Sequence, residues 1–245
     1  KRSTFGHINF IGSDASEHVK DCLDLFVQYL LANFKTFTVK FPPMFYFQGI
    51  ASHLNDALKQ LNKISVIEDC YQSRMISSDV DVIQTLSRTN RRIHRRLERS
   101  GHYVCENDHL TCEGYALLAE NRMSRNVELS LSYKALYSQA CQLKDYFRFF
   151  ETRNKYDILC AYAVTLRLSS DWLYVFYWGE TTLERKRSPV VMLAAEIMLY
   201  CQQEGIQRLD AGTSSISGEL DQTLYDFKRR LGFIPSSKFT VSNFS

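Results

Sequence analysis

Apolar residues recur along the second half of the chain with spacings that predict a definite succession of helices and strands. Spacings of three and four indicate helices, and short apolar runs between polar turns indicate strands. From residue 102 the succession is strand, helix, helix, three strands, helix, strand, helix and strand. We expect these elements at residues 102–105, 108–121, 130–144, 146–151, 158–168, 172–178, 188–201, 207–210, 219–231 and 236–242.

The first half predicts a shorter succession that is followed by one long helix. Strand, helix, strand, helix and strand are expected at residues 5–11, 13–33, 37–41, 54–61 and 64–76. Asp79 is a suitable N-cap for a helix of about twenty residues that ends at Gly101. The buried stripe of that helix consists of Val82, Leu86, Ile93 and Leu97.

Two of the predicted elements are unusually apolar. The helix that begins at Ser188-Pro189 is apolar nearly all round, so we expect it to be buried on most sides. The strand at 172–178 is rich in aromatic residues and is typical of a core strand. Strict alternation assigns its side chains to two faces, Trp172, Tyr174, Phe176 and Trp178 to one, and Leu173, Val175 and Tyr177 to the other.

The composition indicates a globular protein with a substantial core. The chain has 245 residues, of which 45% are hydrophobic, and this suffices for one large domain or two small ones. No apolar run approaches the ~18 residues of a membrane span. The seven cysteines form no Cys-x-x-Cys pair, so we expect reduced thiols, no metal site and a place in the cytoplasm. No histidine follows His109, which excludes a catalytic histidine from the second half.

Positive charge is concentrated in one predicted helix. The formal net charge is only +3, yet residues 88–99 hold six arginines and one acid. Four of these arginines follow one another at spacings of four, three and four and form one stripe: Arg88, Arg92, Arg95 and Arg99. Such a stripe binds the phosphates of RNA or of a nucleotide-linked precursor. The alternative is a solvated face that pairs with acidic residues.

Residues 206–233 predict a strand, a polar loop and a capped helix. The helix places Leu220, Leu224, Phe227 and Leu231 on one apolar face, and Gly232 is its expected C-cap. Ligand crevices form at the carboxyl ends of strands in open sheets, so Asp210, Gly212 and Thr213 are candidates for a cleft. Asp210 suits a cap for the following loop equally well.

The order of elements after residue 102 resembles the fold of the GNAT (Gcn5-related N-acetyltransferase) superfamily. Residues 5–77 look like the back half of the same fold. Two such units in tandem resemble the FemABX family, whose enzymes transfer an aminoacyl group from charged tRNA to an amine on a peptidoglycan precursor. The resemblance implies an α/β (α+β) protein with mixed central sheets flanked by helices, a partial unit at 1–100 and a complete unit at 101–245.

Phe227 and Lys228 are the catalytic candidates that the resemblance implies. FemABX enzymes carry a Phe-Lys pair in the corresponding helix near the acyl-transfer centre. A fixed cation there stabilises a tetrahedral oxyanion, and an adjacent aromatic face holds a cationic group. Alternatively, Lys228 is one of three cations in the last helical turn, where the helix dipole favours each by ~0.3–1 kcal/mol.

The loop at 179–188 is the expected anion site. In ordinary GNAT enzymes this turn is Gly-rich, and its backbone N–H groups hold the CoA pyrophosphate at a helix N-terminus. The Gly-x-Gly pattern is absent here, which argues against the use of acetyl-CoA. Four residues still place cations and a hydroxyl before the helix and suit an anion: Arg185, Lys186, Arg187 and Ser188. A solvated basic loop is the alternative.

Together these features predict an acyl or aminoacyl transferase that resembles the FemABX enzymes. An amine on a small molecule or a peptide attacks an activated ester, with aminoacyl-tRNA as the donor and Lys228 stabilising the developing charge. No metal or redox cofactor is implied. Two rival interpretations stay open: an acyl-CoA-dependent N-acyltransferase of the same fold, and a non-catalytic GNAT-like binding protein.

Overall fold

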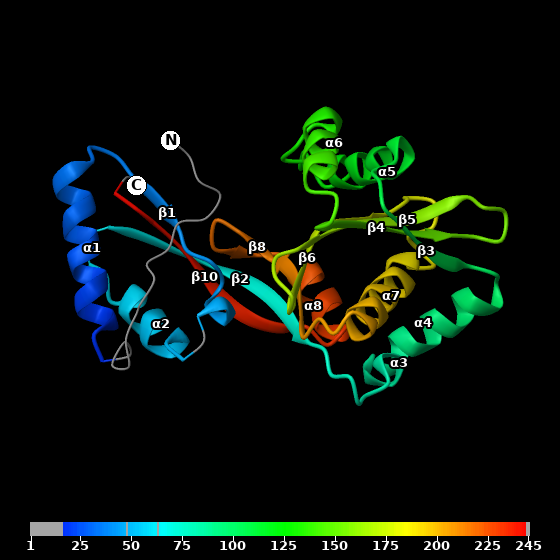
Figure 1. Ribbon diagram of the computed structural model, residues 1–245, viewed down its shortest axis with the longest axis horizontal. Helices are drawn as coiled ribbons and strands as arrows, with labels where there is room; N and C mark the ends of the chain where they lie inside the picture. Colours follow the sequence, from blue (N-terminus) through cyan, green and yellow to red (C-terminus); the bar gives the residue numbers. More distant parts are fainter. Residues whose placement is uncertain (1–16, 48, 63, 244–245) are drawn as a thin grey trace. The chain divides into compact units, whose positions relative to one another are not determined.

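The computed structural model describes residues 17–47, 49–62 and 64–243, and the chain divides into two compact units (Figure 1). The first unit holds the described residues up to Ser73, residues 213–225 and the chain from Ile234 onward, whereas the second holds residues 74–212 and 226–233. The boundary that the sequence places between residues 100 and 101 lies inside the second unit. The last strand belongs to the first unit, because it pairs with a strand of the first half.

Apart from the last strand, the second unit contains the succession of elements that the apolar pattern predicts after residue 102. Its strands follow the order β7-β6-β5-β4-β3, and all neighbours are antiparallel except β6 and β7. The predicted order is confirmed. The elements are β3 (Tyr103–Asn107), α5 (Cys112–Met123), α6 (Tyr133–Gln142), β4 (Phe147–Arg153), β5 (Leu159–Arg167), β6 (Trp172–Glu180), α7 (Pro189–Gln203), β7 (Arg208–Thr213) and α8 (Gln222–Arg230).

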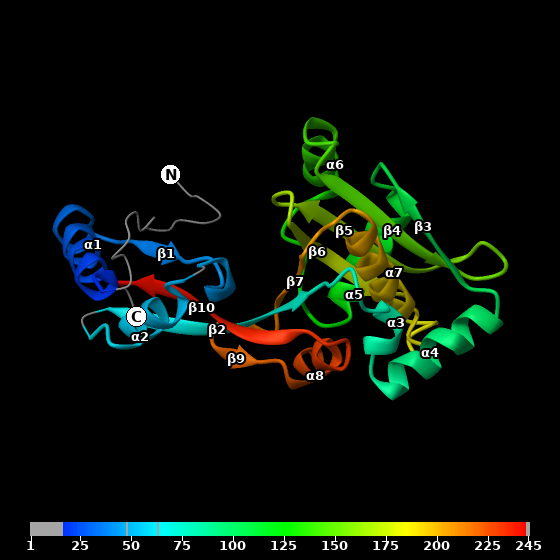
Figure 2. The same ribbon diagram turned by 60° about the horizontal axis from the view of Figure 1, so that its bottom comes forward.

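Helices cover both faces of this sheet, so the second unit has two cores (Figures 1 and 2). Helices α5 and α6 pack on one face, and α7 packs on the other. As its composition predicts, α7 is buried on nearly all sides, and Leu193, Ala194 and Ile197 have no exposed surface. Burying a leucine or isoleucine side chain stabilises the fold by about 1.5–3 kcal/mol, so α7 anchors this face of the sheet.

The single long helix expected up to Gly101 is wrong, because the chain forms two helices there, α3 (Val82–Thr85) and α4 (Arg88–Arg99). Leu86 and Ser87 between them are extended, each with a ψ of 153°. The Ser87 hydroxyl accepts the Asn90 N–H at 3.2 Å and caps α4. Serine competes for backbone groups in this way, so it favours the start of a new helix over the continuation of the old one. The expected cap is also displaced, from Asp79 to Asp81.

The first unit has a three-stranded antiparallel sheet in the order β1-β10-β2, with α1 and α2 packed against it. Strand β10 pairs with β2 from Ile234–Ser73 to Ser242–Ser65. The strand expected at residues 5–11 lies outside the described residues. No helix within the described ranges is long and apolar enough to cross a bilayer. The elements are α1 (Val19–Asn33), β1 (Thr38–Lys40), a 3-10 turn (Met44–Tyr46), α2 (Ala51–Lys59), β2 (Ser65–Met75), β8 (Ser215–Ile216), β9 (Glu219–Leu220) and β10 (Ile234–Ser242).

The final helix begins later than the sequence predicts and ends where the sequence predicts. Glu219 and Leu220 belong to the β8–β9 hairpin, so the helix begins at Gln222. Leu220 is 45% exposed and therefore does not join the apolar face assigned to it. Gly232 has a φ of +85° after the helix, which confirms it as the C-cap.

The two glycines that follow α7 and α8 predict a measurable difference in stability. Gly205 (φ +67°) has open space where a Cβ would lie, whereas a Cβ on Gly232 would come within 2.6 Å of the Arg74 guanidinium. Gly205→Ala should cost about 1–2 kcal/mol, the penalty for a left-handed alanine. Gly232→Ala should cost at least about 1 kcal/mol more, because the buried Arg74 must move. Urea unfolding of both variants measures the difference, and equal losses would contradict this account.

Candidate functional site

The parallel strands β6 and β7 pair over a short distance and then separate. Their register runs from Trp172–Arg208 to Tyr174–Asp210, while β6 continues to Glu180. Ligands in open α/β sheets bind outside the carboxyl ends of such strands. The point where β6 and β7 separate is therefore the expected position of a ligand-binding site.

A bulge in β6 changes which side chains face each core. Val164 of β5 lies opposite Tyr177 and Thr165 lies opposite Val175, so Phe176 is an extra residue without a partner in the register. The strict alternation predicted for this strand is wrong beyond the bulge. Trp178 packs with the α7 cluster that contains Val175, and Tyr177 is buried in the α5–α6 cluster. The bulge thus turns the Trp178 ring toward the end of α8.

Phe227 packs against this turned part of β6. Its ring lies 5.6 Å from the Trp178 ring, measured between centroids, and Phe233 lies 6.1 Å from Trp178 on the same side. The rings meet edge to face, which is a favourable geometry for aromatic pairs. Phe227 is partly buried in the core, as its place on the predicted apolar face indicates, and it connects the end of α8 to β6.

Lys228 differs from its two basic neighbours because its side chain is buried. It is 1% exposed, whereas Arg229 and Arg230 are exposed. The Lys228 ammonium donates a hydrogen bond to the Gly212 carbonyl at 3.0 Å. A surface cation that only complements the helix dipole would not be buried in this way, because a buried ammonium is costly unless it is paired and hydrogen-bonded.

Asp210 holds the other side of the same glycine. Its carboxylate accepts the Gly212 N–H at 2.7 Å, and the residue is 2% exposed. Gly212 thus has its N–H bonded to a carboxylate and its carbonyl bonded to an ammonium, with a φ of +73°. The catalytic candidate Lys228 and the cleft candidates Asp210 and Gly212 therefore meet at the end of β7. The Asp210 carboxylate thereby also caps the following loop, which is the other role that the sequence predicts for this residue.

The Tyr174 ring lies beside Gly212. A Cβ on Gly212 would lie 3.4 Å from the Tyr174 ring, and Tyr174 pairs with Asp210 in the strand register. Burial, and then the charge of Asp210, raise the pKa of the Tyr174 hydroxyl far above its usual range, so it is a neutral donor at physiological pH. The Arg122 guanidinium of α5 lies 5.9 Å from the centroid of the Tyr177 ring. Burial lowers the pKa of Arg122.

The third residue expected in a cleft, Thr213, belongs to the first unit. Its hydroxyl donates to the Ser215 carbonyl at 2.7 Å and to the Cys70 carbonyl at 3.4 Å. A cavity of about 570 Å³ lies in the same unit. Its lining includes Asp69, Cys70, Ser215 and Tyr225.

Glu180 occupies the N-terminus of α7, where the sequence predicts an anion. Its carboxylate accepts the Val190 N–H at 3.3 Å. Burial raises the pKa of Glu180 to about 7, and the Val190 N–H, Arg185 and Arg125 oppose the rise. Serine before a helix usually caps it with its side chain, but Ser188 does not, because its φ is +57° and its hydroxyl bonds to the Arg185 carbonyl. A carboxyl group of the chain itself therefore lies at the helix N-terminus where the sequence predicts an external anion.

The two basic segments predicted from the sequence lie together in the second unit. The Arg96 guanidinium donates to the Arg187 carbonyl at 3.0 Å, which joins α4 to the loop at 181–188. Arg99 and Arg187 line the same cavity of about 500 Å³, which also contains Lys155 and no acidic lining residue. We call this the basic cavity. Four further candidates of the two segments are exposed: Arg88, Arg92, Arg95 and Lys186. Arg185 bonds to the Ser124 hydroxyl at 3.1 Å.

The end of α8 also contacts the start of α4. The Asn90 amide donates to the Arg230 carbonyl at 3.0 Å, and the Ser87 N–H donates to the same oxygen at 3.4 Å. Arg230 lies two residues after Lys228. The helix that carries the arginine stripe is therefore attached to the helix that carries Lys228, although Lys228 itself lines neither of the two cavities.

Comparison with solved structures finds several proteins of similar fold. The crystal structure of FemX matches with a TM-score of 0.62 and 14% identity, over 96% of this chain and 78% of that one. The C-terminal domain (DUF2156) of a putative lysylphosphatidylglycerol synthetase from Agrobacterium fabrum matches with a TM-score of 0.60 and 12% identity, over 92% and 73%. L-PGS from Bacillus licheniformis matches with a TM-score of 0.57 and 9% identity, over 94% and 74%.

These matches span both units and confirm the fold class and the likeness to FemABX proteins. Identities of 9–14% show the fold alone. No protein-family model matches the sequence, and comparison with curated proteins finds no match.

Glu180 predicts a pH-dependent stability. Because burial raises its folded pKa from 4.5 to about 7, its stabilising contribution is complete below pH 4.5 and is lost as the pH rises through about 7. Glu180→Gln keeps an acceptor for the Val190 N–H and removes the titration. Relative to this variant, the wild type should lose about 1–3 kcal/mol between about pH 5 and pH 8. Urea unfolding at both pH values measures the change, and a pH-independent difference would contradict it.

Proposed function

We propose that this protein is an acyltransferase that moves an activated acyl group, carried by a polyanionic donor such as aminoacyl-tRNA, onto an amine. The observation that carries the proposal is the buried Lys228 ammonium, oriented by Gly212 where β6 and β7 separate. A GNAT-like fold supports the same reaction class, and FemX is a structure of similar fold. Lys228 has the charge and the fixed position that acyl transfer requires.

The reaction that suits this arrangement is aminolysis of an ester. The acceptor nitrogen attacks the acyl carbon, a C–N bond forms, and the ester C–O bond breaks. The proton lost by the amine passes to the departing hydroxyl oxygen of the donor. Negative charge develops on the acyl oxygen in between, and a preorganised cation stabilises it without reorganisation. Lys228 is assigned this role, and Phe227 fixes the end of α8 by packing on Trp178.

A polyanionic donor fits the arginine-rich surface of the second unit. Arg88, Arg92 and Arg95 are exposed on α4, and Arg99 and Arg187 share the basic cavity with Lys155. Arginine contacts phosphates with two parallel hydrogen bonds, so a row of exposed arginines suits a nucleic-acid backbone. Glu180 argues against CoA, because its carboxyl group already bonds to the N-terminus of α7, where a pyrophosphate would bind.

A non-catalytic GNAT-like binding protein is the second candidate. Two observations favour it: Lys228 is only 1% exposed, and Phe227 packs within the core. In that case Lys228 would stabilise the end of β7, and the arginine surface would serve binding alone. Binding and transfer must therefore be measured separately.

The arginine surface predicts salt-dependent binding of tRNA. Filter binding of charged tRNA across a salt series should give a steep slope. Exchange of Arg92 and Arg95 for alanine should reduce the slope of log K against log salt by about one for each arginine removed. Lys134→Ala with Lys144→Ala is the matched control, because it removes the same charge from the opposite side of the sheet. Equal slopes for the two double variants, or displacement of tRNA by CoA, would contradict the proposed donor.

Lys228 predicts a loss of transfer that exceeds any loss of binding. Lys228→Met keeps most of the side-chain volume and removes the charge. The rate of transfer from charged tRNA to an amine should fall by about 10²–10³, the usual effect of removing one oxyanion donor, while the tRNA affinity stays the same. Arg229→Met is the control, because Arg229 is exposed on the same turn. Melting curves verify that both variants are folded. An unchanged rate in folded Lys228→Met would contradict the catalytic role of Lys228, whereas no transfer by the wild type would favour the non-catalytic candidate.

A further inference from the structure

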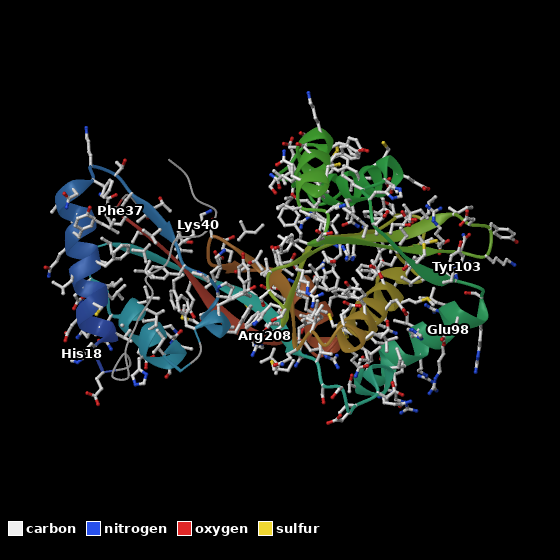
Figure 3. All side chains as sticks on the ribbon, viewed as in Figure 1. His18, Phe37, Lys40, Glu98, Tyr103 and Arg208 are labelled. Atoms are coloured by element: carbon white, nitrogen blue, oxygen red, sulfur yellow. The ribbon has the colours of Figure 1, made fainter. Side chains whose placement is uncertain are left out.

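Three potential metal ligands meet in the second unit, and the proposed transfer uses none of them. His102 precedes β3, Cys160 lies on β5, and Glu184 lies in the loop between β6 and α7. Their ligand atoms all lie within 4.8 Å of one another. Tyr103, the residue after His102, is labelled in Figure 3 at the same end of the second unit as Glu98 of α4. The fold therefore brings together a nitrogen, a sulfur and a carboxylate from three separate segments.

The imidazole of His102 has one nitrogen bonded and one nitrogen without a partner. Nδ1 lies 2.9 Å from the Ser100 hydroxyl, whereas Nε2 is buried and has no hydrogen bond within the described part of the chain. The residue is 5% exposed. A buried polar atom without a partner is destabilising, and such atoms in native proteins often mark an ion or a functional role. Its neighbour Cys160 is completely buried.

Glu184 is the ligand with access to solvent. Its side chain is 19% exposed, and Arg187 lies 3.4 Å from its carboxylate. The Arg187 side chain is 58% exposed, so it can withdraw without the loss of any core packing. The Arg187 guanidinium therefore competes weakly for the Glu184 carboxylate, and a divalent cation must displace it.

We propose that His102, Cys160 and Glu184 bind a Zn²⁺ ion, with a water molecule in the fourth position. A set of one imidazole, one thiolate and one carboxylate suits zinc, which binds such groups at about 2.0–2.3 Å in a tetrahedron. In that geometry the ligand atoms lie about 3.3–3.8 Å apart, so the three side chains must draw together by about 1 Å. The Cys160 thiol releases its proton to solvent when the metal binds.

The ion would connect the start of β3, the strand β5 and the loop at 181–188. This loop leads into α7 and carries Arg187 of the basic cavity. Bound zinc would therefore fix the segment that holds part of the proposed donor surface. The inference is independent of the transfer reaction, and its test uses no activity.

Cobalt titration of the metal-free protein tests the site. Co²⁺ replaces Zn²⁺ and gives a near-ultraviolet charge-transfer band only when a thiolate binds it. The wild type should show this band at one equivalent, and Zn²⁺ should abolish it. Cys160→Ala should lose the band. Cys201→Ala is the matched control, because Cys201 is equally buried, lies on α7 and is not one of the three ligands, and it should keep the band. Melting in a chelator shows whether both variants fold.

Two further variants keep the test decisive if Cys160→Ala does not fold. Glu184→Gln should weaken Zn²⁺ binding by at least about tenfold, whereas Arg187→Gln should strengthen it by removing the competing cation. A wild type without the band, a band that survives in folded Cys160→Ala, or equal affinities in Glu184→Gln and Arg187→Gln would overturn the proposal.

Discussion

A buried ammonium and a buried carboxylate hold opposite sides of one glycine, and the candidate transfer site depends on this arrangement. Lys228 bonds to the Gly212 carbonyl, and Asp210 bonds to its N–H. Burying a charged side chain costs several kcal/mol unless the charge is well paired and hydrogen-bonded. The hydrogen bonds of Lys228 and Asp210 to Gly212 are therefore needed to keep both side chains buried. The arrangement determines where β7 ends, why residue 212 is a glycine beside Tyr174, and where the end of α8 lies.

The remaining features follow from the same anchor. The bulge at Phe176 turns Trp178 toward α8, and Phe227 packs on it, so the end of α8 contacts β6 and β7 at once. The carbonyl of Arg230, the last residue of α8, accepts a hydrogen bond from Asn90 near the start of α4. Helix α4 carries the exposed arginines and contacts the basic loop through Arg96. One continuous set of contacts thus connects the proposed catalytic cation to the proposed donor surface, within a single unit.

The apolar pattern predicted the second unit well, because periodicity reports local structure. The succession from residue 102 onward and the cap at Gly232 are present. The pattern failed where one side chain overrode it. The Ser87 hydroxyl caps a new helix, although the apolar stripe continues across this position. The bulge at Phe176 reverses the alternation of side chains in an otherwise regular strand.

The contents of the site were harder to predict than its framework. Lys228 lies four residues after Leu224 and three before Leu231, so helical spacing puts it beside the apolar face, but only the fold shows that its ammonium bonds to the Gly212 carbonyl. The sequence did not mark Glu180 as a site residue. Its hydrogen bond goes to the N-terminus of α7, which begins nine residues later, so only the fold shows the contact. His102, Cys160 and Glu184 lie in three segments with no ligand spacing, so only the fold brings them together.

The most direct test of the central claim is a single-turnover measurement with the wild-type protein. Excess protein is mixed with tRNA that carries labelled amino acids, in the presence of a mixture of small amines and short peptides. The account predicts that the label leaves its ester and appears in an amide that resists mild base, at a rate well above that without protein. If the charged tRNA binds and the lifetime of its ester bond is unchanged, the protein does not transfer this group, and the proposed role of Lys228 is contradicted.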